Sequence, residues 1–485
     1  MPRFCIPYTG WTRALALACS TLLLPLPAVS DEQQLPSLGS TYSSGTSEEY
    51  RLGRAWLRQF RAHAPQWQDP IAHDYLTGLI DRLAPHSQLS DLDVITVMVD
   101  HRTLNAFAVP GGIVGINAGL FAFAEDEGAF VSVIAHELGH LSQRHYARSS
   151  ARAEQTQLPA MAGMLAGLLI AAGGGGNAGI AAAMGSQAAL IQDQLTYSRR
   201  YEQEADRVGL QAMADAGYDP NAMAQMFRTL QRMTSLQGGT PPEFLLTHPV
   251  SESRLSDAQS RAAQMDIAAS YSSDTLYDMI RGRALLQIHQ QSPQQALSRL
   301  RQEDADDTAQ RYVSALVDAK TGQVDTALQT LDQLANQQPD LAMLPASAAE
   351  VALEAQRFDE AIRRSQQLLR LMPDYIPAQL ILAEAQLQRD PDAAYDVLRD
   401  VTAQHPENPQ GFNLLAEAAG RSGRNGWGHL ARAEYLQLTG RMDSSIRQLD
   451  IAEDAAEQEN DRQALARIEQ RREDFMDYRE ALEAF

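Results

Sequence analysis

Alanine and proline recur at a fixed interval in the second half of this 485-residue chain. Each type returns after 33 or 34 residues, at Ala327, Ala361 and Ala394 and at Pro339, Pro373 and Pro406. A period of this length is typical of stacked helix pairs, in which small residues lie where two helices cross and proline ends the second helix. The pattern therefore predicts an α-helical solenoid in which each unit is stabilised mainly by its neighbours.

The residues around these alanines indicate tetratricopeptide repeats. Residues 323–328 align with 357–362, and a weaker copy lies at 440–446. With an irregular first unit at 292–300, the region 271–485 would hold about four to five repeats. Stacked repeats form a concave face, which we expect to bind another protein; a domain that only stabilises the first half is the alternative.

The first 30 residues have the layout of a secretory signal peptide. A positively charged start precedes an apolar stretch at 14–26, and small residues at 28–30 supply a cleavage site. Both cysteines, Cys5 and Cys19, lie inside this segment, so the mature chain would have no disulfide. Lipidation at Cys19 is a second interpretation.

The chain is long and acidic. At about 100–200 residues per domain, its length predicts two to four domains. Its formal net charge is −21 at pH 7, and loss of residues 1–30, which contain two arginines and no acid, would bring it to −23. Because nucleic acids and anionic lipids repel such a protein, neither is expected as the main partner.

Residues 133–140, Val-Ile-Ala-His-Glu-Leu-Gly-His, place two histidines four positions apart in an apolar stretch that predicts a helix. His136 and His140 would share one helical face and could reach one metal ion. Glu137 would lie about a third of a turn away, where it could act as general base on metal-bound water. The H-E-x-x-H pattern is typical of zinc peptidases and predicts one Zn²⁺ per chain.

A second acidic group lies at 201–206, Tyr-Glu-Gln-Glu-Ala-Asp. Catalytic zinc takes three protein ligands and keeps one position for water, so a carboxylate from this second predicted helix would complete the set. Glu202 and Asp206 are four positions apart, and one could bind the ion while the other accepts a ring N–H from a ligand histidine. Glu204 would point elsewhere. By itself such a cluster is more typical of a solvated helix face.

The segment 155–192 between these helices contains no charged residue. Its apolar arms, 158–172 and 180–191, flank four consecutive glycines, and each arm is shorter than the ~20 residues needed to span a bilayer. We interpret the segment as a flap over the metal cleft, with peripheral membrane contact through 158–191 as a second role. A buried helical hairpin is the plain alternative.

β-branched residues at 93–99 predict a strand, and residues 105–117 predict two short strands around a Pro-Gly-Gly turn. An exposed edge strand beside a zinc helix could bind an extended peptide through backbone hydrogen bonds. We therefore predict Asn105, Phe107 and Val114 as substrate-binding residues. An ordinary hairpin without this role is the alternative.

Four motifs in this chain resemble the peptidase family of HtpX and the CAAX prenyl protease. They are the hairpin at 105–112, H-E-x-x-H at 136–140, Ser-Arg-Arg-Tyr-Glu-x-Glu-Ala-Asp at 198–206 and Thr-His-Pro at 247–249. The periplasmic branch with a signal peptide and C-terminal repeats is most similar. The resemblance implies a mostly α-helical protein, with a zincin-like α+β peptidase domain at 31–265 followed by the repeat domain at 271–485.

The resemblance also implies roles for particular residues. Glu202 would be the third zinc ligand, and Asp206 would support a ligand histidine. His248 would lie near the metal, where it either stabilises the transition state or occupies the position of the water and silences the enzyme. Arg254 matches the family pattern and would contact substrate or pair with a carboxylate; a solvated arginine is the alternative. The other histidines show no ligand spacing and are predicted to be structural or exposed: His63, His73, His101, His145, His289 and His405.

The function implied is that of a zinc endopeptidase in the periplasm of a Gram-negative bacterium. Its substrates would be unfolded, misassembled or stalled outer-membrane β-barrel proteins, and its repeats would bind the outer-membrane barrel-assembly machinery. A chaperone or assembly factor, for which proteolysis is secondary, is the main alternative. A metal-binding scaffold without turnover is a weaker one, since ligands and a base are all present.

Overall fold

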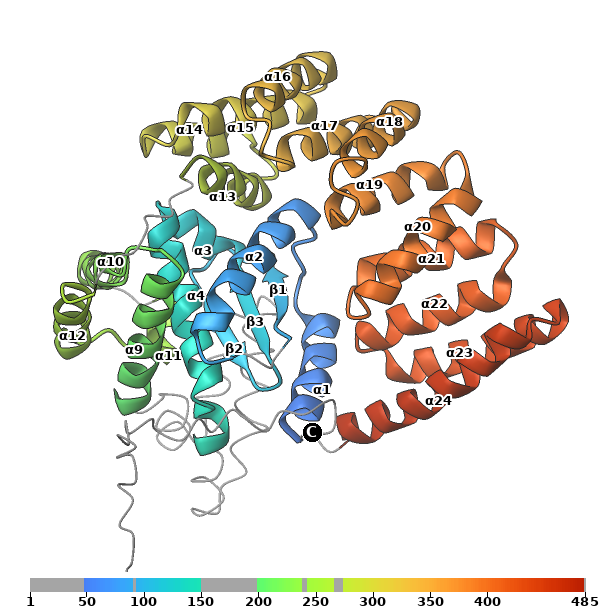
Figure 1. The fold of residues 1–485 in the computed structure, drawn as a ribbon, viewed down its shortest axis with the longest axis horizontal. Coiled ribbons are helices and arrows are strands. Elements are labelled where there is room, and N and C mark those ends of the chain that lie inside the picture. Colours follow the sequence, from blue (N-terminus) through green and yellow to red (C-terminus); the bar gives the residue numbers. More distant parts are fainter. Residues whose placement is uncertain (1–47, 90–92, 150–198, 238–241, 266–273, 484–485) are drawn as a thin grey trace, which may run out of the picture. The chain divides into compact units, whose positions relative to one another are not determined.

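The computed structural model describes residues 48–89, 93–149, 199–237, 242–265 and 274–483 (Figure 1). The predicted signal peptide and the apolar segment 155–192 lie outside these residues. The described chain is mostly helical with one small sheet, which confirms the predicted fold class. Among the described helices, none combines the length and the apolar composition that a membrane crossing requires.

The sheet has three strands, β1 (Ile95–Val99), β2 (Ala106–Val109) and β3 (Ile113–Asn117), in the order β1-β3-β2. β3 pairs parallel with β1 and antiparallel with β2. In the described part of the chain β2 therefore has one paired edge only, as expected for the hairpin. Gly111 and Gly112 in its turn have φ angles of 81° and 78°, a conformation that glycine adopts without strain.

A helical stretch lies at 145–149, and eight further α-helices and one 3₁₀ turn lie in the described parts of residues 48–265. They are α1 (Glu48–His63), α2 (Pro70–Leu83), η1 (Ala84–His86), α3 (Ala118–Phe123), α4 (Glu127–Ser142), α9 (Arg199–Asp215), α10 (Asn221–Gln237), α11 (Glu243–Thr247) and α12 (Glu252–Ala262). One face of the sheet packs on α1 through Trp56, Phe60 and Phe107. α4 contacts β2, so the helix that carries H-E-x-x-H lies next to the edge strand.

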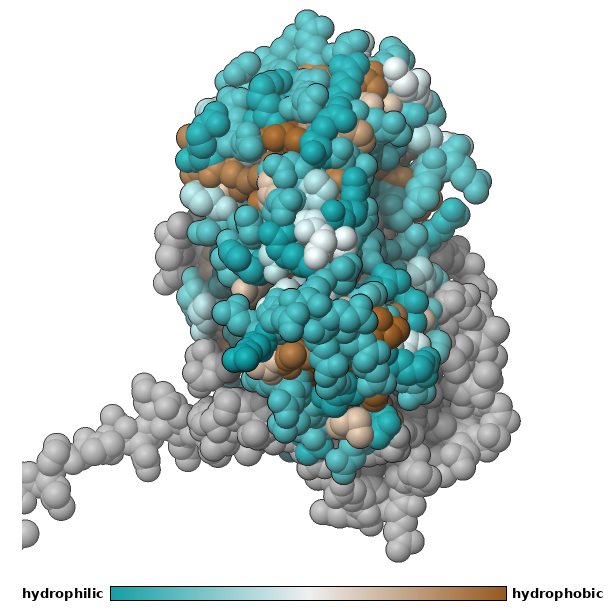
Figure 2. Space-filling model, turned by 90° about the vertical axis from the view of Figure 1, so that its right-hand side faces the viewer, coloured by the Kyte–Doolittle hydropathy of each residue, from teal (hydrophilic) through white to brown (hydrophobic). Residues whose placement is uncertain are grey.

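Twelve helices lie within the described residues 274–483. They are α13 (Asp274–Ile288), α14 (Gln294–Gln302), α15 (Asp307–Lys320), α16 (Val324–Gln337), α17 (Met343–Glu354), α18 (Phe358–Leu369), α19 (Ile376–Leu387), α20 (Pro391–Gln404), α21 (Pro409–Arg421), α22 (Asn425–Leu438), α23 (Met442–Glu459) and α24 (Arg462–Glu483). Ala327, Ala361 and Ala394 are fully buried in α16, α18 and α20, as the repeat pattern predicts. The face drawn in Figure 2 is largely hydrophilic, with separate hydrophobic patches.

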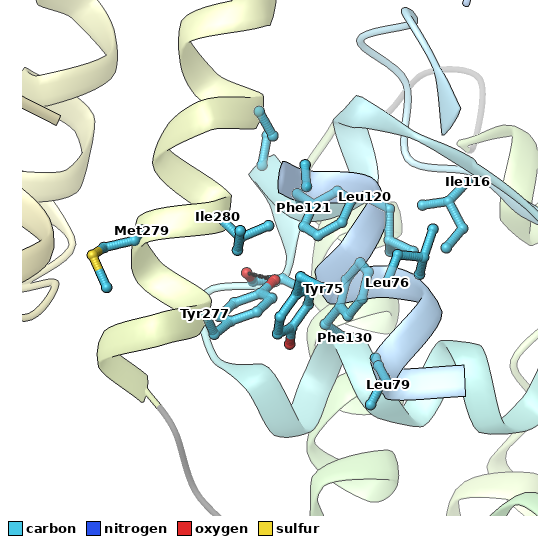
Figure 3. Close-up of a cluster of buried hydrophobic side chains, with 14 of the residues drawn as sticks. Tyr75, Leu76, Leu79, Ile116, Leu120, Phe121, Phe130, Tyr277, Met279 and Ile280 are labelled. Carbon is cyan, nitrogen blue, oxygen red and sulfur yellow. Dashed lines mark hydrogen bonds between the residues drawn. The ribbon is translucent and has the colours of Figure 1, made fainter. Parts of the chain in front are cut away.

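The first repeat helix packs directly on the core of the first half. Tyr277 of α13 lies among Tyr75, Phe121 and Phe130, and its hydroxyl donates to the carbonyl of Ala124 at 2.8 Å (Figure 3). The same hydrophobic cluster continues into α17 and α19. Residues of both predicted domains therefore share one continuous core.

Candidate metal centre

Helix α4 is almost entirely buried, which is unusual for a helix with three ionisable side chains in its second half. Asp126 caps its N-terminus by accepting a hydrogen bond from the amide of Ala129 at 2.7 Å. His136, Glu137 and His140 are exposed by only 2%, 1% and 4%. Because burial of an unpaired charge is costly, these groups require polar partners from neighbouring elements.

Helix α9 supplies those partners and approaches α4 very closely. A side chain at Gly139 would place its Cβ 2.6 Å from the carbonyl oxygen of Ala205, and one at Gly209 would lie 3.0 Å from the backbone of Ala135. Glycine at both positions therefore permits the helices to meet. This contact brings Glu202 to the face of α4 that carries the two histidines.

Four side chains converge at this contact. Nε2 of His136 lies 3.0 Å from Nε2 of His140 and 3.4 Å from Oε2 of Glu202, and Oε1 of Glu202 lies 3.4 Å from Nε2 of His140. The fourth member, His248, follows α11; its Nδ1 lies 3.2 Å from Nε2 of His136 and 3.3 Å from Oε1 of Glu202. All four side chains are buried.

These separations suit a metal ion. Four ligand atoms at about 2.0–2.1 Å from a tetrahedral zinc ion are about 3.3–3.4 Å apart. The donor atoms of His136, His140, Glu202 and His248 all lie within 4.8 Å of one another, and most measured pairs fall between 3.0 and 3.4 Å. Without a cation to bind, the burial of three imidazoles and a carboxylate at one point would cost desolvation free energy that no metal–ligand bond offsets.

Asp206 and Arg254 support the cluster from one side. Oδ1 of Asp206 lies 2.9 Å from Nδ1 of His136, the ring nitrogen that faces away from the cluster. Arg254 donates to both oxygens of Asp206 and to Oε2 of Glu202, each at 2.7 Å. Burial alone would lower the pKa of His136, but hydrogen bonds with Asp206 and Glu202 raise it to about 9.

The pKa values of the two carboxylates, Glu202 and Glu137, are shifted in opposite directions. Burial alone would raise the pKa of Glu202, but the charge of His248 and hydrogen bonds from the histidines hold it well below its usual range. Glu137, in contrast, has a raised pKa because burial dominates. Its Oε1 makes no hydrogen bond within the described part of the chain and lies 3.5 Å from Nε2 of His248. A fixed anion and a proton-accepting carboxylate are thus side by side.

Comparison with known proteins agrees with this geometry. Residues 70–262 match the model of peptidase family M48, and residues 352–418 match a tetratricopeptide repeat model. The β-barrel assembly-enhancing protease of Escherichia coli strain K12 is 32% identical over 448 residues, which cover 90% of this chain and 91% of that protein. The chain belongs to peptidase family M48. This assignment confirms that it is a metallopeptidase with a repeat region.

Other relatives of this M48 peptidase cover different shares of its length. The β-barrel assembly-enhancing protease of Yersinia pestis is 32% identical over 447 residues, or 89% of this chain and 92% of that protein. The mitochondrial metalloendopeptidase OMA1 of Schizosaccharomyces pombe is 30% identical over 191 residues, or 37% of this chain and 50% of its own. The similarity to OMA1 therefore covers a smaller share of both proteins.

His145 of this M48 peptidase agrees with the structural role predicted for it and makes contacts that its spacing did not indicate. The sequence predicts it to be structural or exposed. The structure buries it completely, with Nδ1 2.9 Å from Nδ1 of His140 and Nε2 3.2 Å from Oε2 of Glu204. The turn that redirects the chain after α4 contains Arg144 with a φ of 49°, and helical spacing alone could not reveal this contact.

The predicted substrate-binding residues are also placed differently from expectation. Phe107 packs its ring in the core against α1 and over Gly115, and Val114 is fully buried on the central strand. Neither side chain can face a peptide, so only the backbone of β2, next to the half-buried Asn105, remains for that role. Arg254 is 3% exposed and paired with carboxylates, which rules out the solvated arginine and leaves its guanidinium no free face for substrate.

Proposed function

We propose that this M48 peptidase is a zinc-dependent endopeptidase in which His136, His140 and Glu202 hold one Zn²⁺. The convergence of these three donors on one buried point carries the proposal. A zinc ion bound there would polarise the peptide carbonyl and lower the pKa of a bound water. Glu137 would take the proton from that water and pass it to the leaving nitrogen, because its Oε1 lies beside the cluster, 3.5 Å from Nε2 of His248.

Asp206 would fix the ring of His136 for metal binding. A neutral histidine that binds a metal through Nε2 carries its proton on Nδ1, and Oδ1 of Asp206 is placed to accept that proton at 2.9 Å. Arg254 would keep Asp206 and Glu202 ionised and in position. Arg254 would thus be a positioning residue rather than a substrate contact.

For His248 we favour the silencing role over transition-state stabilisation. Its Nδ1 lies at the distances from His136 and Glu202 that suit a fourth ligand, where catalytic zinc keeps a water. While it stays there, the site would be closed to water and substrate. His248→Ala should therefore raise the rate of proteolysis, whereas loss of a transition-state contact would lower it.

The substrates and location are proposed from the named relatives. Two of them are β-barrel assembly-enhancing proteases that this chain matches over most of its length. We infer an exported, periplasmic protein, divided into a peptidase domain at 31–265 and a repeat domain at 271–485. It would degrade misassembled outer-membrane β-barrel proteins and bind the barrel-assembly machinery through its repeats. The backbone of β2 offers an unpaired edge in the described sheet for an exposed strand of such a substrate.

A second candidate function is assistance of assembly by binding alone. The observation that favours it is His248 in the fourth position, since a resting enzyme closed in this way would meet its partners without cleaving them. The two functions differ in their need for Glu137. If a Glu137→Gln variant still supports assembly of outer-membrane proteins in cells, binding is the main role; if it does not, proteolysis is.

The direct test compares metal content and casein digestion of purified proteins. In a His248→Ala background, Glu137→Gln should retain one zinc per chain but lose about 10²–10⁴-fold in digestion rate, the usual contribution of a general base. Asp215→Asn, an exposed acid at the C-terminal end of α9, is the control for loss of one carboxylate. Undiminished digestion by Glu137→Gln, or a wild type that binds no metal, would contradict the proposal.

A further inference from the structure

His140 has a partner on the ring nitrogen that faces away from the candidate metal position. Its Nε2 points into the cluster with His136 and Glu202, and its Nδ1 lies 2.9 Å from Nδ1 of His145. This arrangement parallels His136, whose outward nitrogen faces Asp206. Each of the two histidines therefore has its own support, but one is a carboxylate and the other is an imidazole.

The protons in this chain of contacts can be assigned in only one order. A neutral His140 that binds metal through Nε2 carries its proton on Nδ1 and must donate it. Nδ1 of His145 then has to accept, which places the proton of a neutral His145 on Nε2. That N–H is 3.2 Å from Oε2 of Glu204, a carboxylate oxygen able to accept it.

Glu204 is held in place by two arginines. Nη1 of Arg148 donates to Oε2 at 2.7 Å and Nε of Arg200 donates to Oε1 at 2.8 Å. These contacts fix the oxygen that faces His145. The imidazole itself is stacked on the ring of Tyr201, with centroids 4.6 Å apart and planes inclined by 22°. Its ring therefore has little freedom to rotate away from His140.

We propose that His145, oriented by Glu204, is the positioning residue that fixes the tautomer and ring orientation of His140 for metal binding. The inference rests on the proposed zinc site. Packing against Tyr201 alone would require only a flat side chain of the right size. It would not require both ring nitrogens of His145 to face a histidine nitrogen on one side and a carboxylate on the other.

The test measures metal binding rather than proteolysis. Zinc affinity is determined by competition with a chromogenic chelator, and the absorption bands of the Co²⁺-substituted protein report the ligand geometry. His145→Ala should weaken zinc affinity by about 10–100-fold, the usual effect of losing such a partner, and shift the cobalt bands. His145→Asn should recover much of the affinity, because its amide oxygen can accept near the position of Nδ1.

Two controls make the outcome decisive. His429→Ala removes a half-buried histidine from the repeat region, where it contacts Gln448, and should leave zinc affinity unchanged. Glu204→Ala, at a partly exposed site, should weaken affinity in the same direction as His145→Ala and reports on the chain of contacts even if His145→Ala fails to fold. The inference would be overturned if His145→Ala bound zinc as tightly as His145→Asn. It would also be overturned if both His145→Ala and Glu204→Ala kept wild-type zinc affinity. Failure of the wild type to bind zinc would instead contradict the proposed function.

Discussion

Arginine–aspartate pairs occur in both halves of the molecule, in opposite surroundings. At the metal centre Arg254 binds both oxygens of Asp206 at 2.7 Å, and their side chains are 3% and 4% exposed. In the repeats, such pairs link successive units on the surface and recur along the solenoid. They are Asp325–Arg357 at 2.6 Å, Asp359–Arg389 at 3.0 Å and Asp392–Arg424 at 2.6 Å, with aspartates 66–88% exposed.

The comparison shows that the distance between the charged atoms does not by itself decide how much a pair contributes to the free energy of unfolding. A buried pair cannot regain water when one partner is lost, so the remaining charge is uncompensated. An exposed pair exchanges its partner for water at little cost. The stability of the repeats should therefore come from the buried alanines and leucines, and that of the metal centre from a charge network in which every member is needed.

Loss of Arg254 should have the largest effect on stability. Arg254→Ala leaves Asp206 and Glu202 buried without their cation and should lower the free energy of unfolding by about 3–5 kcal/mol. The measurement is urea denaturation of the metal-free protein. Arg424→Ala in the repeats is the matched control and should change the free energy of unfolding little. Equal losses of stability for the two variants would contradict the difference between buried and exposed pairs.

Glycine substitutions sharpen the comparison between the two regions. Gly139→Ala would place Cβ 2.6 Å from the carbonyl of Ala205, so α9 must shift and about 1–3 kcal/mol of stability should be lost, together with zinc affinity. Gly420→Ala lies in α21 with no atom within 4 Å of its Cβ. It should gain up to about 1 kcal/mol from helix propensity. Thermal unfolding and zinc titration of both variants test this, and a neutral Gly139→Ala would contradict the close contact.

The contrast between the regions also explains what could be read from the sequence. The repeats are local and periodic, so a 33–34-residue spacing of alanines was enough to predict their helices. His136, Glu137 and His140 were equally readable, since one helix fixes their relation. The contact of His145 with His140 was not predictable, because it depends on a turn at Arg144. Pairing of Arg254 with a carboxylate could be given only as one of several alternatives, because it depends on where α12 packs. The burial of the Phe107 side chain was not predicted either, because a strand pattern does not say which face meets α1.

Glu407 tests the boundary between the two regions, because it joins the repeats to α1. Arg61 binds its side chain at 3.3 Å, and Arg54 and Arg58 lie within 3.9 Å. Burial alone would raise the pKa of Glu407, but these three arginines lower it. A quarter of the Glu407 side chain is exposed. Glu407→Gln should therefore lower the free energy of unfolding by about 1–2 kcal/mol at pH 7, less than the loss of one partner in a fully buried pair.

The pH dependence of that loss follows from the lowered pKa. The carboxylate of Glu407 contributes its full stability above its unfolded pKa, near 4.5, and loses it as the pH falls through the lower value of the folded state. The difference in unfolding free energy between wild type and Glu407→Gln should thus be constant from about pH 8 to pH 5 and narrow only in more acidic solution. A difference that already changes near pH 7 would assign the effect to another group.

The smallest effect is expected for the exposed pair Asp392–Arg424. Asp392→Asn removes one charge from a contact that water can replace, so the free energy of unfolding should stay within about 0.5 kcal/mol of wild type. Any residual difference should shrink at 1 M salt, where the screening length falls to about 3 Å. Exchanging the two residues, Asp392→Arg with Arg424→Asp, should change the free energy of unfolding equally little. A loss of stability as large as that of Glu407→Gln would mean that these recurring pairs stabilise the repeats, and that the exposure of a pair does not predict its contribution to the free energy of unfolding.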